Sequence, residues 1–310
     1  MTQTVAIIGA TGNQGGSVLR ALHATGKYSI VAVTRDVSSA SASKIKADFP
    51  DVKLATADLD DVESLKQAFE GADIVFGVTV YMQPIILSRI ASGDIDAEFH
   101  QGKNIVDAAI SAGVEKIVFS TMYSLEELSD GKYAEAPHFE SKYKIETYIK
   151  SKSPEIRGAF IHLGSYMENF FWFSRISQED NKTVELTFPT KPTTKIPLVN
   201  VKKDTGGVVT HILDNFDDFD GKALPVSGGY YQPHEIVEAF TEATGKPASY
   251  VQVPYDSMNN FPMEQMFRSM DEFGYFGWRT DFLETNKKME YKHTTPVEFF
   301  RNSGWTGPSQ

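Results

Sequence analysis

The feature that most constrains this chain lies at its start, where a short apolar run leads into a glycine-rich turn and then a helix-like segment. The sequence reads VAIIGATGNQGGSVLRAL, with Gly9, Gly12 and Gly15 each separated by two residues. In such a turn the first glycine permits a tight bend, the second lets the backbone approach a pyrophosphate, and the third lets helix and strand pack closely. The helix N-terminus adds N–H groups and a positive dipole end. This order predicts a nucleotide-binding loop, and the alternative is a purely structural turn.

The same alternation of apolar runs and helix-period segments continues through the first half of the chain. The runs that we interpret as strands are 5–9, 28–34, 52–57, 73–80, 115–121 and 157–164. The segments that we interpret as helices are 15–24, 62–71, 97–112 and 139–152. Strands that alternate with helices over short connections become parallel strands with right-handed crossovers. We therefore expect an α/β fold with a Rossmann-type, doubly wound parallel sheet.

The pattern loosens after about residue 160, which predicts a change in architecture. Helices are expected at 204–215, 232–245 and 258–272, and short strands at 223–226 and 250–253. We expect a nucleotide-binding domain over residues 1–160 and a smaller α/β C-terminal lobe over 161–310, some segments of which rejoin the sheet.

Charge and cysteine content limit the chemistry. The 310 residues include 30 Lys and Arg, 41 Asp and Glu and no Cys, for a net charge of −11. Without cysteine the chain has no disulfides, thiolate metal sites or Cys nucleophile. The acidic balance argues against a general electrostatic grip on nucleic acid or an anionic membrane. We find no apolar run of membrane-spanning length and no signal-peptide pattern, and expect an intracellular protein that acts without membrane or direct nucleic-acid binding.

The residues after the second expected strand select the nucleotide. NAD-binding chains commonly place Asp or Glu there for the ribose 2′-hydroxyl, whereas this chain has Thr34 and Arg35. A guanidinium fork suits a 2′-phosphate, and the Thr34 hydroxyl adds a donor. The sequence therefore favours NADP over NAD. The alternative is that Arg35 is a solvated charge paired with Asp36.

Other candidate contacts to the nucleotide come from the loop and from later strand ends. Asp58 closes the third strand, where it could reach the adenine amino group with Leu59 against the ring, or could instead cap the next helix. Val78 and Thr79 end the fourth strand and should line a ribose, with Tyr81 just beyond them. The loop side chains that could donate further hydrogen bonds are Thr11, Asn13 and Gln14.

Taken together, the glycine loop, Thr34-Arg35, Asp58, the strand IVFST and the segment YMENF resemble the NmrA-like family, which is related to the extended short-chain dehydrogenase/reductases. The resemblance reaches from the N-terminus to about residue 255. It implies a Rossmann domain with a small C-terminal lobe and NADP binding in several members. It also implies that Tyr166 and Asn169 contact the nicotinamide; the alternative places Tyr166 and Phe170–Phe173 in an aromatic core. Members divide between reductases and nucleotide-binding proteins without known turnover, among them transcriptional co-regulators and redox sensors.

The catalytic position departs from the pattern of the related reductases. Those enzymes use Tyr-x-x-x-Lys on one helix face, in which Lys lowers the tyrosine pKa and Tyr transfers a proton. Here the matching segment is HFESK, so Lys142 aligns and His138 stands where the tyrosine would be. The family's serine position matches Ser120, Thr121 or Met122 equally well. The tyrosine-dependent mechanism therefore does not transfer directly to this chain.

Two hypotheses remain open for these residues. Lys142 could contact the ribose or nicotinamide, or be a solvated helix lysine; His138 could donate a proton, or simply begin the helix. The first functional hypothesis is an NADP(H)-binding regulator that responds to the nucleotide and acts through a protein partner. The second is an NADPH-dependent reductase of a small carbonyl, quinone or imine, with Lys142 and His138 in its active site. A monomer or homodimer in the cytoplasm, and for a transcriptional role also in the nucleus, fits either hypothesis.

Overall fold

The computed structural model describes residues 2–308, and the chain divides into two compact units. The first unit comprises the residues up to Tyr123, His138–His162 and Thr205–Leu224. The second unit comprises Ser124–Pro137, Leu163–Asp204 and the chain from Pro225 onward. Each unit is thus assembled from three separate stretches of sequence. The expected domains at 1–160 and 161–310 stay a prediction.

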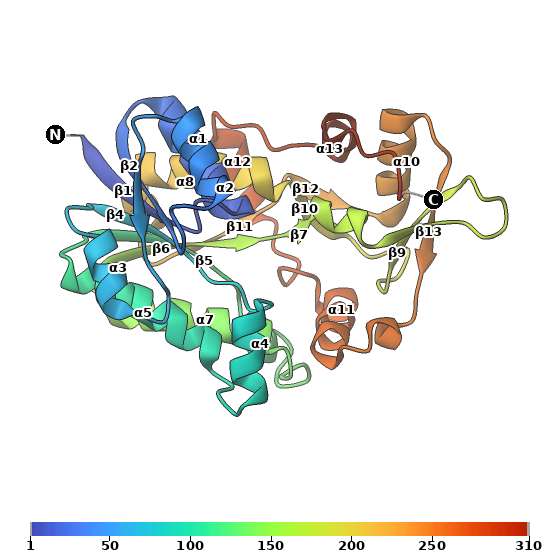
Figure 1. Cartoon of the computed structure of the whole chain (residues 1–310). Coiled ribbons are helices and arrows are strands. Elements are labelled where there is room, and N and C mark those ends of the chain that lie inside the picture. Colours follow the sequence, from blue (N-terminus) through green and yellow to red (C-terminus); the bar gives the residue numbers. More distant parts are fainter. Residues whose placement is uncertain (1, 309–310) are drawn as a thin grey trace. The chain divides into compact units, whose positions relative to one another are not determined.

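A seven-stranded parallel sheet forms the centre of the first unit, in the order β11-β6-β5-β4-β1-β2-β3 (Figure 1). Its strands are β1 (Gln3–Ile8), β2 (Tyr28–Thr34), β3 (Lys53–Thr56), β4 (Ile74–Val78), β5 (Lys116–Thr121), β6 (Arg157–Leu163) and β11 (Ala223–Val226). Every residue of β4 is buried, as is typical of a parallel strand covered on both faces. The predicted Rossmann-type, doubly wound α/β fold is confirmed.

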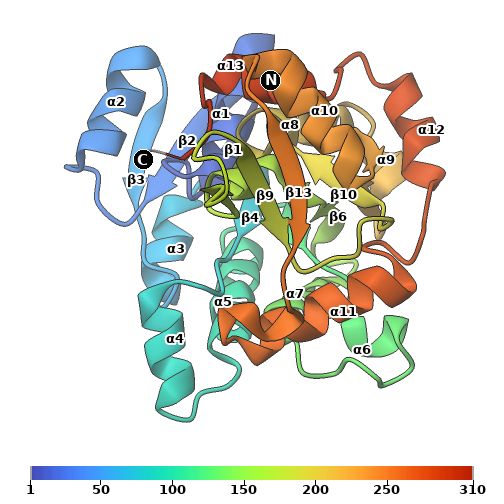
Figure 2. The same cartoon turned by 90° about the vertical axis from the view of Figure 1, so that its right-hand side faces the viewer.

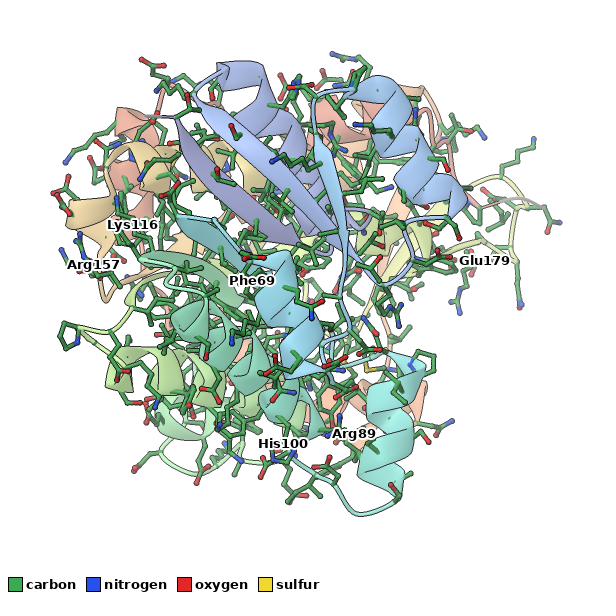
Figure 3. All side chains as sticks on the ribbon, turned by 60° about the vertical axis from the view of Figure 1, so that its left-hand side comes forward. Phe69, Arg89, His100, Lys116, Arg157 and Glu179 are labelled. Carbon is green, nitrogen blue, oxygen red and sulfur yellow. The ribbon has the colours of Figure 1, made fainter. Side chains whose placement is uncertain are left out.

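Helices cover both faces of this sheet. They are α1 (Asn13–Thr25), α2 (Ala40–Asp48), α3 (Val62–Ala68), α4 (Pro84–Ala91), α5 (Ala97–Ser111), α7 (Pro137–Ser151), α8 (Val201–Asp214) and α9 (Phe216–Phe219). Figure 1 shows α1 and α8 over one face and α3, α5 and α7 over the other. Phe69, directly after α3, is fully buried, and Figure 3 marks its position beneath that helix. Apolar side chains from both helical layers therefore enclose the sheet.

The strand order reverses between β1 and β4, the two neighbouring strands at the middle of the sheet. The chain runs outward from β1 to β2 and β3 and returns to β4, so the carboxyl ends of β1 and β4 flank a topological switch point. Ligands of open α/β sheets bind at such points. At the opposite, amino end, Lys116 and Arg157 begin β5 and β6, and each lies 5.2 Å from the centre of the Phe216 ring (Figure 3). The carboxyl edge is therefore where a ligand site is expected.

The second unit is an α/β lobe with two three-stranded sheets, ordered β12-β10-β7 and β13-β9-β8. Its strands are β7 (Ser165–Tyr166), β8 (Ser174–Ile176), β9 (Val184–Phe188), β10 (Ile196–Val199), β12 (Gly229–Tyr231) and β13 (Ala248–Gln252). Its helices are α6 (Leu125–Leu128), α10 (Pro233–Thr244), α11 (Phe261–Phe273), α12 (Asp281–Lys288) and α13 (Pro296–Ser303), with 3₁₀ turns η1 (Met167–Phe171) and η2 (Tyr255–Met258). Figure 2 shows β9 and β13 side by side, and α10 packs against both α13 and β13.

None of the helices within residues 2–308 combines the length and the apolar character that a membrane crossing requires.

Candidate functional site

The glycine loop has the backbone geometry that its sequence predicts. Gly9 adopts a left-handed φ of 64°, and the Gly12 N–H donates to the Gly9 carbonyl at 2.8 Å, which closes the turn between β1 and α1. A Cβ on Gly15 would lie 2.3 Å from that same carbonyl oxygen and 2.6 Å from the Ile8 oxygen, so only glycine fits there. The loop is thus built for close approach of helix and strand.

The start of α1 has no capping side chain. Gly12 occupies the N-cap position, no side chain caps the helix, and its first turn contains no acidic residue. Thr11 and Asn13 are exposed beside this helix end, and Gln14 is half-buried. A thirteen-residue helix that begins without a side-chain cap presents its positive dipole end and backbone N–H groups to a phosphate.

Arg35 follows β2 as an exposed cation, and Thr34 is half-buried at the strand end. Of the expected alternative, a solvated charge paired with Asp36, the solvation agrees with the structure. The pair does not form, because the Asp36 carboxylate instead accepts from the Ser38 N–H at 2.8 Å and the Ser38 hydroxyl at 2.6 Å. Within residues 2–308 no carboxylate lies within ion-pair distance of the Arg35 guanidinium. Its donors are therefore available to an external anion.

Asp58 is exposed after β3, and it does not cap the next helix. The N-cap of α3 is Asp61, whose Oδ1 accepts from the N–H groups of Glu63 and Ser64 at 3.1 and 3.2 Å. The Asp58 carboxylate accepts a local bond from the Asp60 N–H, at 2.9 Å. The capping alternative for Asp58 is therefore wrong. Leu59 is half-buried next to it.

The end of β4 borders the glycine loop. Val78 is buried, and its Cγ1 lies 3.4 Å from where a Gly9 Cβ would be, so the two strand ends at the switch point are in contact. Thr79 is the next residue and is also buried. Lys142 reaches this strand end from α7: its ammonium donates to the Thr79 carbonyl at 3.0 Å and to the Thr79 hydroxyl oxygen at 3.2 Å.

A buried glutamate completes the surroundings of Lys142. Glu98 on α5 has a side chain with no exposed surface and forms an ion pair with the Lys142 ammonium. The Thr79 hydroxyl donates to the same carboxylate at 2.9 Å, and the Ser141 hydroxyl donates to its other oxygen. Because only 17% of the Lys142 side chain is exposed, the alternative of a solvated helix lysine is wrong.

His138 lies one turn before Lys142, at the start of α7. Its ring centre is 6.0 Å from that of Tyr81, and its Nε2 is buried with no hydrogen-bond partner among residues 2–308. Burial, followed by the nearby charge of Lys142, lowers the pKa of the imidazole to about 4. The ring is therefore neutral at neutral pH. Burial and the charge of Glu98 raise the pKa of Tyr81 above its usual range.

A second buried glutamate, Glu146, belongs to α7 itself, one turn after Lys142. Glu146 accepts from the Thr121 hydroxyl at 2.6 Å and from Lys150 at 2.8 Å, and it bonds His162 Nε2 at 2.7 Å. Burial alone would raise its pKa, but these hydrogen bonds outweigh burial and lower it to about 2. His162 is thus a hydrogen-bonded core histidine. The Thr121 hydroxyl at the end of β5 is committed to this interior network.

Comparison with known proteins identifies the family. The model of the NmrA-like family matches residues 1–300. The chain belongs to the NmrA-like family. It is 27% identical to an NmrA-like family domain-containing protein of Dictyostelium discoideum, over 94% of this chain and 99% of that one. It is 31% identical to an NmrA-like family domain-containing oxidoreductase of Aspergillus campestris, over 88% of this chain and 84% of that one.

Solved structures share the fold of this NmrA-like chain. The crystal structure of NmrA, a negative transcriptional regulator, in complex with NADP has a TM-score of 0.72 at 21% identity, covering 98% of this chain and 93% of that chain. The NADPH-dependent quinone oxidoreductase of Escherichia coli, complexed with NADPH, has a TM-score of 0.72 at 18% identity, covering 97% of this chain and 99% of that one. The fold is therefore shared by proteins described as a regulator and as a reductase.

The segment YMENF, part of the family resemblance, belongs to the second unit. Tyr166 ends β7 and Asn169 lies in η1, and both are half-buried. Between them, the Glu168 carboxylate accepts from the backbone N–H groups at the start of α8, of which that of Lys202 lies at 3.2 Å. The aromatic-core interpretation holds for Phe170, which is buried, but not for Trp172, which is 83% exposed.

Sequence reasoning missed Glu98, Ser141 and the role of Thr79 as a partner of Lys142. A signal for Glu98 was present, since it lies three and seven residues before Gln101 and Ile105 on the buried face of α5. A carboxylate on such a face needs a buried cationic partner, and Lys142 is that partner. In the part of the chain between residues 2 and 308, no three His, Asp or Glu side chains are grouped so as to hold a metal ion.

Proposed function

We propose that this NmrA-like chain binds NADP(H) and acts as a nucleotide-responsive regulator. The glycine loop and the start of α1 would hold the pyrophosphate, and Arg35 with Thr34 would hold the 2′-phosphate. Asp58 and Leu59 would meet the adenine, and Lys142 the nicotinamide ribose. The nucleotides bound by the NmrA regulator and the quinone oxidoreductase support this assignment.

The residues fit this nucleotide in charge and in space. Arg35 has no carboxylate partner among residues 2–308, the helix start is uncapped, and the Gly15 position admits no side chain. These three features lie at the carboxyl ends of β1 and β2, beside the switch point. A loop with only a structural role would not require an unpaired cation at the end of the neighbouring strand.

The regulatory role is supported mainly by the two residues in the catalytic position: His138 is not protonated at neutral pH, and Lys142 is bonded to other protein groups. Bound NADPH supplies a hydride, and reduction of a carbonyl by that hydride also needs a proton donor. His138 replaces the tyrosine, and an imidazole with a pKa of about 4 carries no labile extra proton at neutral pH. Lys142 is already bonded to Glu98 and Thr79. We infer that nucleotide binding, not turnover, is the output of this site.

Nucleotide selectivity tests the binding assignment. Arg35→Asp removes a charge-assisted bond to the 2′-phosphate and adds a carboxylate suited to the 2′-hydroxyl, so the NADP-to-NAD affinity ratio should fall by about tenfold or more. Lys288→Asp, an equal change of charge at an exposed site on α12, should leave the ratio unchanged. The ratio is measured by calorimetry. A ratio that Arg35→Asp does not alter contradicts the assignment.

A second candidate function is the NADPH-dependent reduction of a small carbonyl, quinone or imine. One similar protein and one contact between two side chains favour it. The Aspergillus campestris relative is named an oxidoreductase. The Tyr81 ring lies beside His138, so the Tyr81 hydroxyl is a second polar group near the catalytic position. If the chain is such an enzyme, His138→Ala and Lys142→Ala should each reduce turnover strongly. Unchanged turnover in both variants counts against these two residues as its catalytic groups.

A further inference from the structure

We propose that Glu98 is a positioning residue that fixes the place and the net charge of Lys142 for the nicotinamide half of the nucleotide, and thereby sets the relative affinity for NADPH and NADP⁺. This inference rests on the proposed function, namely that NADP(H) binds at the carboxyl edge of the sheet.

The contacts of Glu98 join three elements at one point. Its carboxylate is an ion-pair partner of Lys142 from α7 and accepts from the Thr79 hydroxyl, just after β4, at 2.9 Å. Ser141, next to Lys142 on α7, donates to the second carboxylate oxygen. Both carboxylate oxygens of Glu98 therefore bond to Lys142 or to residues next to its ammonium. Glu98 is therefore built to hold Lys142.

The position at which Lys142 is held is next to the nucleotide loop. Its ammonium donates to the Thr79 carbonyl at 3.0 Å, and Thr79 follows Val78, whose side chain borders Gly9. The lysine charge is thus fixed at the switch point between β1 and β4, where doubly wound sheets bind their ligands. Without Glu98 the long lysine side chain would lose a charged partner and part of this constraint.

The charge of this pair bears on the redox state of the nucleotide. The nicotinamide ring carries a positive charge in NADP⁺ and none in NADPH. A Lys⁺–Glu⁻ pair is neutral overall, whereas Lys142 without its partner would present an uncompensated cation to that ring. At a partly buried site, two unit charges separated by about 10 Å still interact strongly enough to change affinity severalfold. Neutralising Glu98 should therefore penalise NADP⁺ more than NADPH.

Glu98→Gln tests this directly, because glutamine keeps the shape and an acceptor oxygen but loses the charge. We expect the NADPH-to-NADP⁺ affinity ratio, measured by calorimetry, to rise about fivefold or more. The affinity for adenosine 2′,5′-bisphosphate, which lacks the nicotinamide half, should stay within about twofold of the parent value. Lys142→Met should shift the ratio in the opposite direction, because it leaves Glu98 as the uncompensated charge. That variant also carries the test if Glu98→Gln does not fold.

The matched control is Glu146→Gln. Glu146 is a buried glutamate of α7 itself, and like Glu98 it holds a lysine and a threonine hydroxyl. The Glu146→Gln variant should have a lower free energy of unfolding but an unchanged NADPH-to-NADP⁺ affinity ratio. Equal loss of all three ligands in Glu98→Gln, or an unchanged ratio in the folded Glu98 and Lys142 variants, overturns the inference. Failure of the parent protein to bind adenosine 2′,5′-bisphosphate or NADPH overturns the proposed function instead.

Discussion

At the scale of single residues, the properties of the site follow from which polar side chains find partners inside the protein. Asp36 uses its carboxylate on Ser38, which leaves the neighbouring Arg35 available for a ligand. Lys142 is in the reverse situation, since Glu98 and Thr79 occupy it. A charged group with an internal partner is fixed in place, whereas one without a partner can bind an external ion.

His138 gives a prediction at this scale. Because burial opposes protonation, its pKa in the folded protein is about 4, below the ordinary value of 6.5. A histidine with a lowered pKa withdraws stability as the pH falls from about 6.5 to about 4, since the unfolded chain then binds the proton more readily. NMR titration, with the His138→Asn variant to assign the signal among the seven histidines, should show a midpoint near 4. A midpoint between about 6 and 7 would contradict the neutral imidazole.

The sequence predicts Arg35, Lys142 and His138 as candidate site residues because local patterns locate them. Arg35 directly follows the strand β2, and His138 and Lys142 lie in the first turns of the helix α7. The helical pattern of α5 places Glu98 on a buried face but does not identify its partner, because Lys142 lies 44 positions further along the chain. Whether a lysine is solvated or buried depends on tertiary contacts, which the spacing of residues along the sequence does not show.

At the scale of elements, the turn between β1 and α1 is the part most sensitive to a single atom. Gly15→Ala would push a Cβ against two backbone oxygens, at 2.3 and 2.6 Å, and backbone cannot yield as a flexible side chain does. We expect it to lower the free energy of unfolding by about 1–3 kcal/mol and to abolish measurable NADPH binding, because the turn must shift. Chemical denaturation and calorimetry measure the two effects.

Gly26→Ala is the control at the other end of α1. Its φ of 65° makes alanine unfavourable, but nothing lies within 4 Å of the new Cβ. It should destabilise the protein by about 1–2 kcal/mol and leave nucleotide affinity unchanged. Equal loss of binding in both variants would mean that stability, not the shape of the turn, limits affinity.

Helix α7 is fastened to β5 and β6 through Glu146, and this contact should appear as acid sensitivity. A carboxylate with a folded pKa of about 2 contributes stability that is fully present above its unfolded value of 4.5 and is lost as the pH falls toward 2. Glu146→Gln should remove about 3 kcal/mol of pH-dependent stability over that range. The control variant Glu155→Gln changes an exposed glutamate and should leave the pH-dependent stability unchanged. An unchanged pH dependence in Glu146→Gln, by urea unfolding at several pH values, would contradict the network.

The elements that the sequence predicts well are those with strong local patterns. The sequence predicts the strand Tyr28–Thr34 with the bounds that the structure has, because this segment is rich in β-branched residues and is followed by charged ones. The strands β9 and β10 and helix α4 were missed. The strands are short and lie among prolines, and the helix PIILSRIA is only eight residues long and begins at a proline.

At the scale of the whole molecule, composition narrows how the protein could signal. With no cysteine, a response to redox state cannot use thiol oxidation, which favours the nucleotide proposed above as its carrier. The net charge of −11 argues against a general electrostatic attraction to nucleic acid, so a role in gene regulation would favour a protein partner over DNA. Neither partner nor pathway is encoded in a local pattern, because recognition depends on surface chemistry contributed by distant parts of the chain.

The central claim, that the protein holds NADP(H) without consuming it, is tested most directly by one measurement. NADPH affinity is first determined by calorimetry, and the saturated protein is then incubated with a panel of carbonyl, quinone and imine compounds while the absorbance of the reduced nicotinamide is followed. We predict tight binding and no oxidation above that of a protein-free control. Oxidation of NADPH at ordinary enzyme rates with any compound of the panel would contradict the claim.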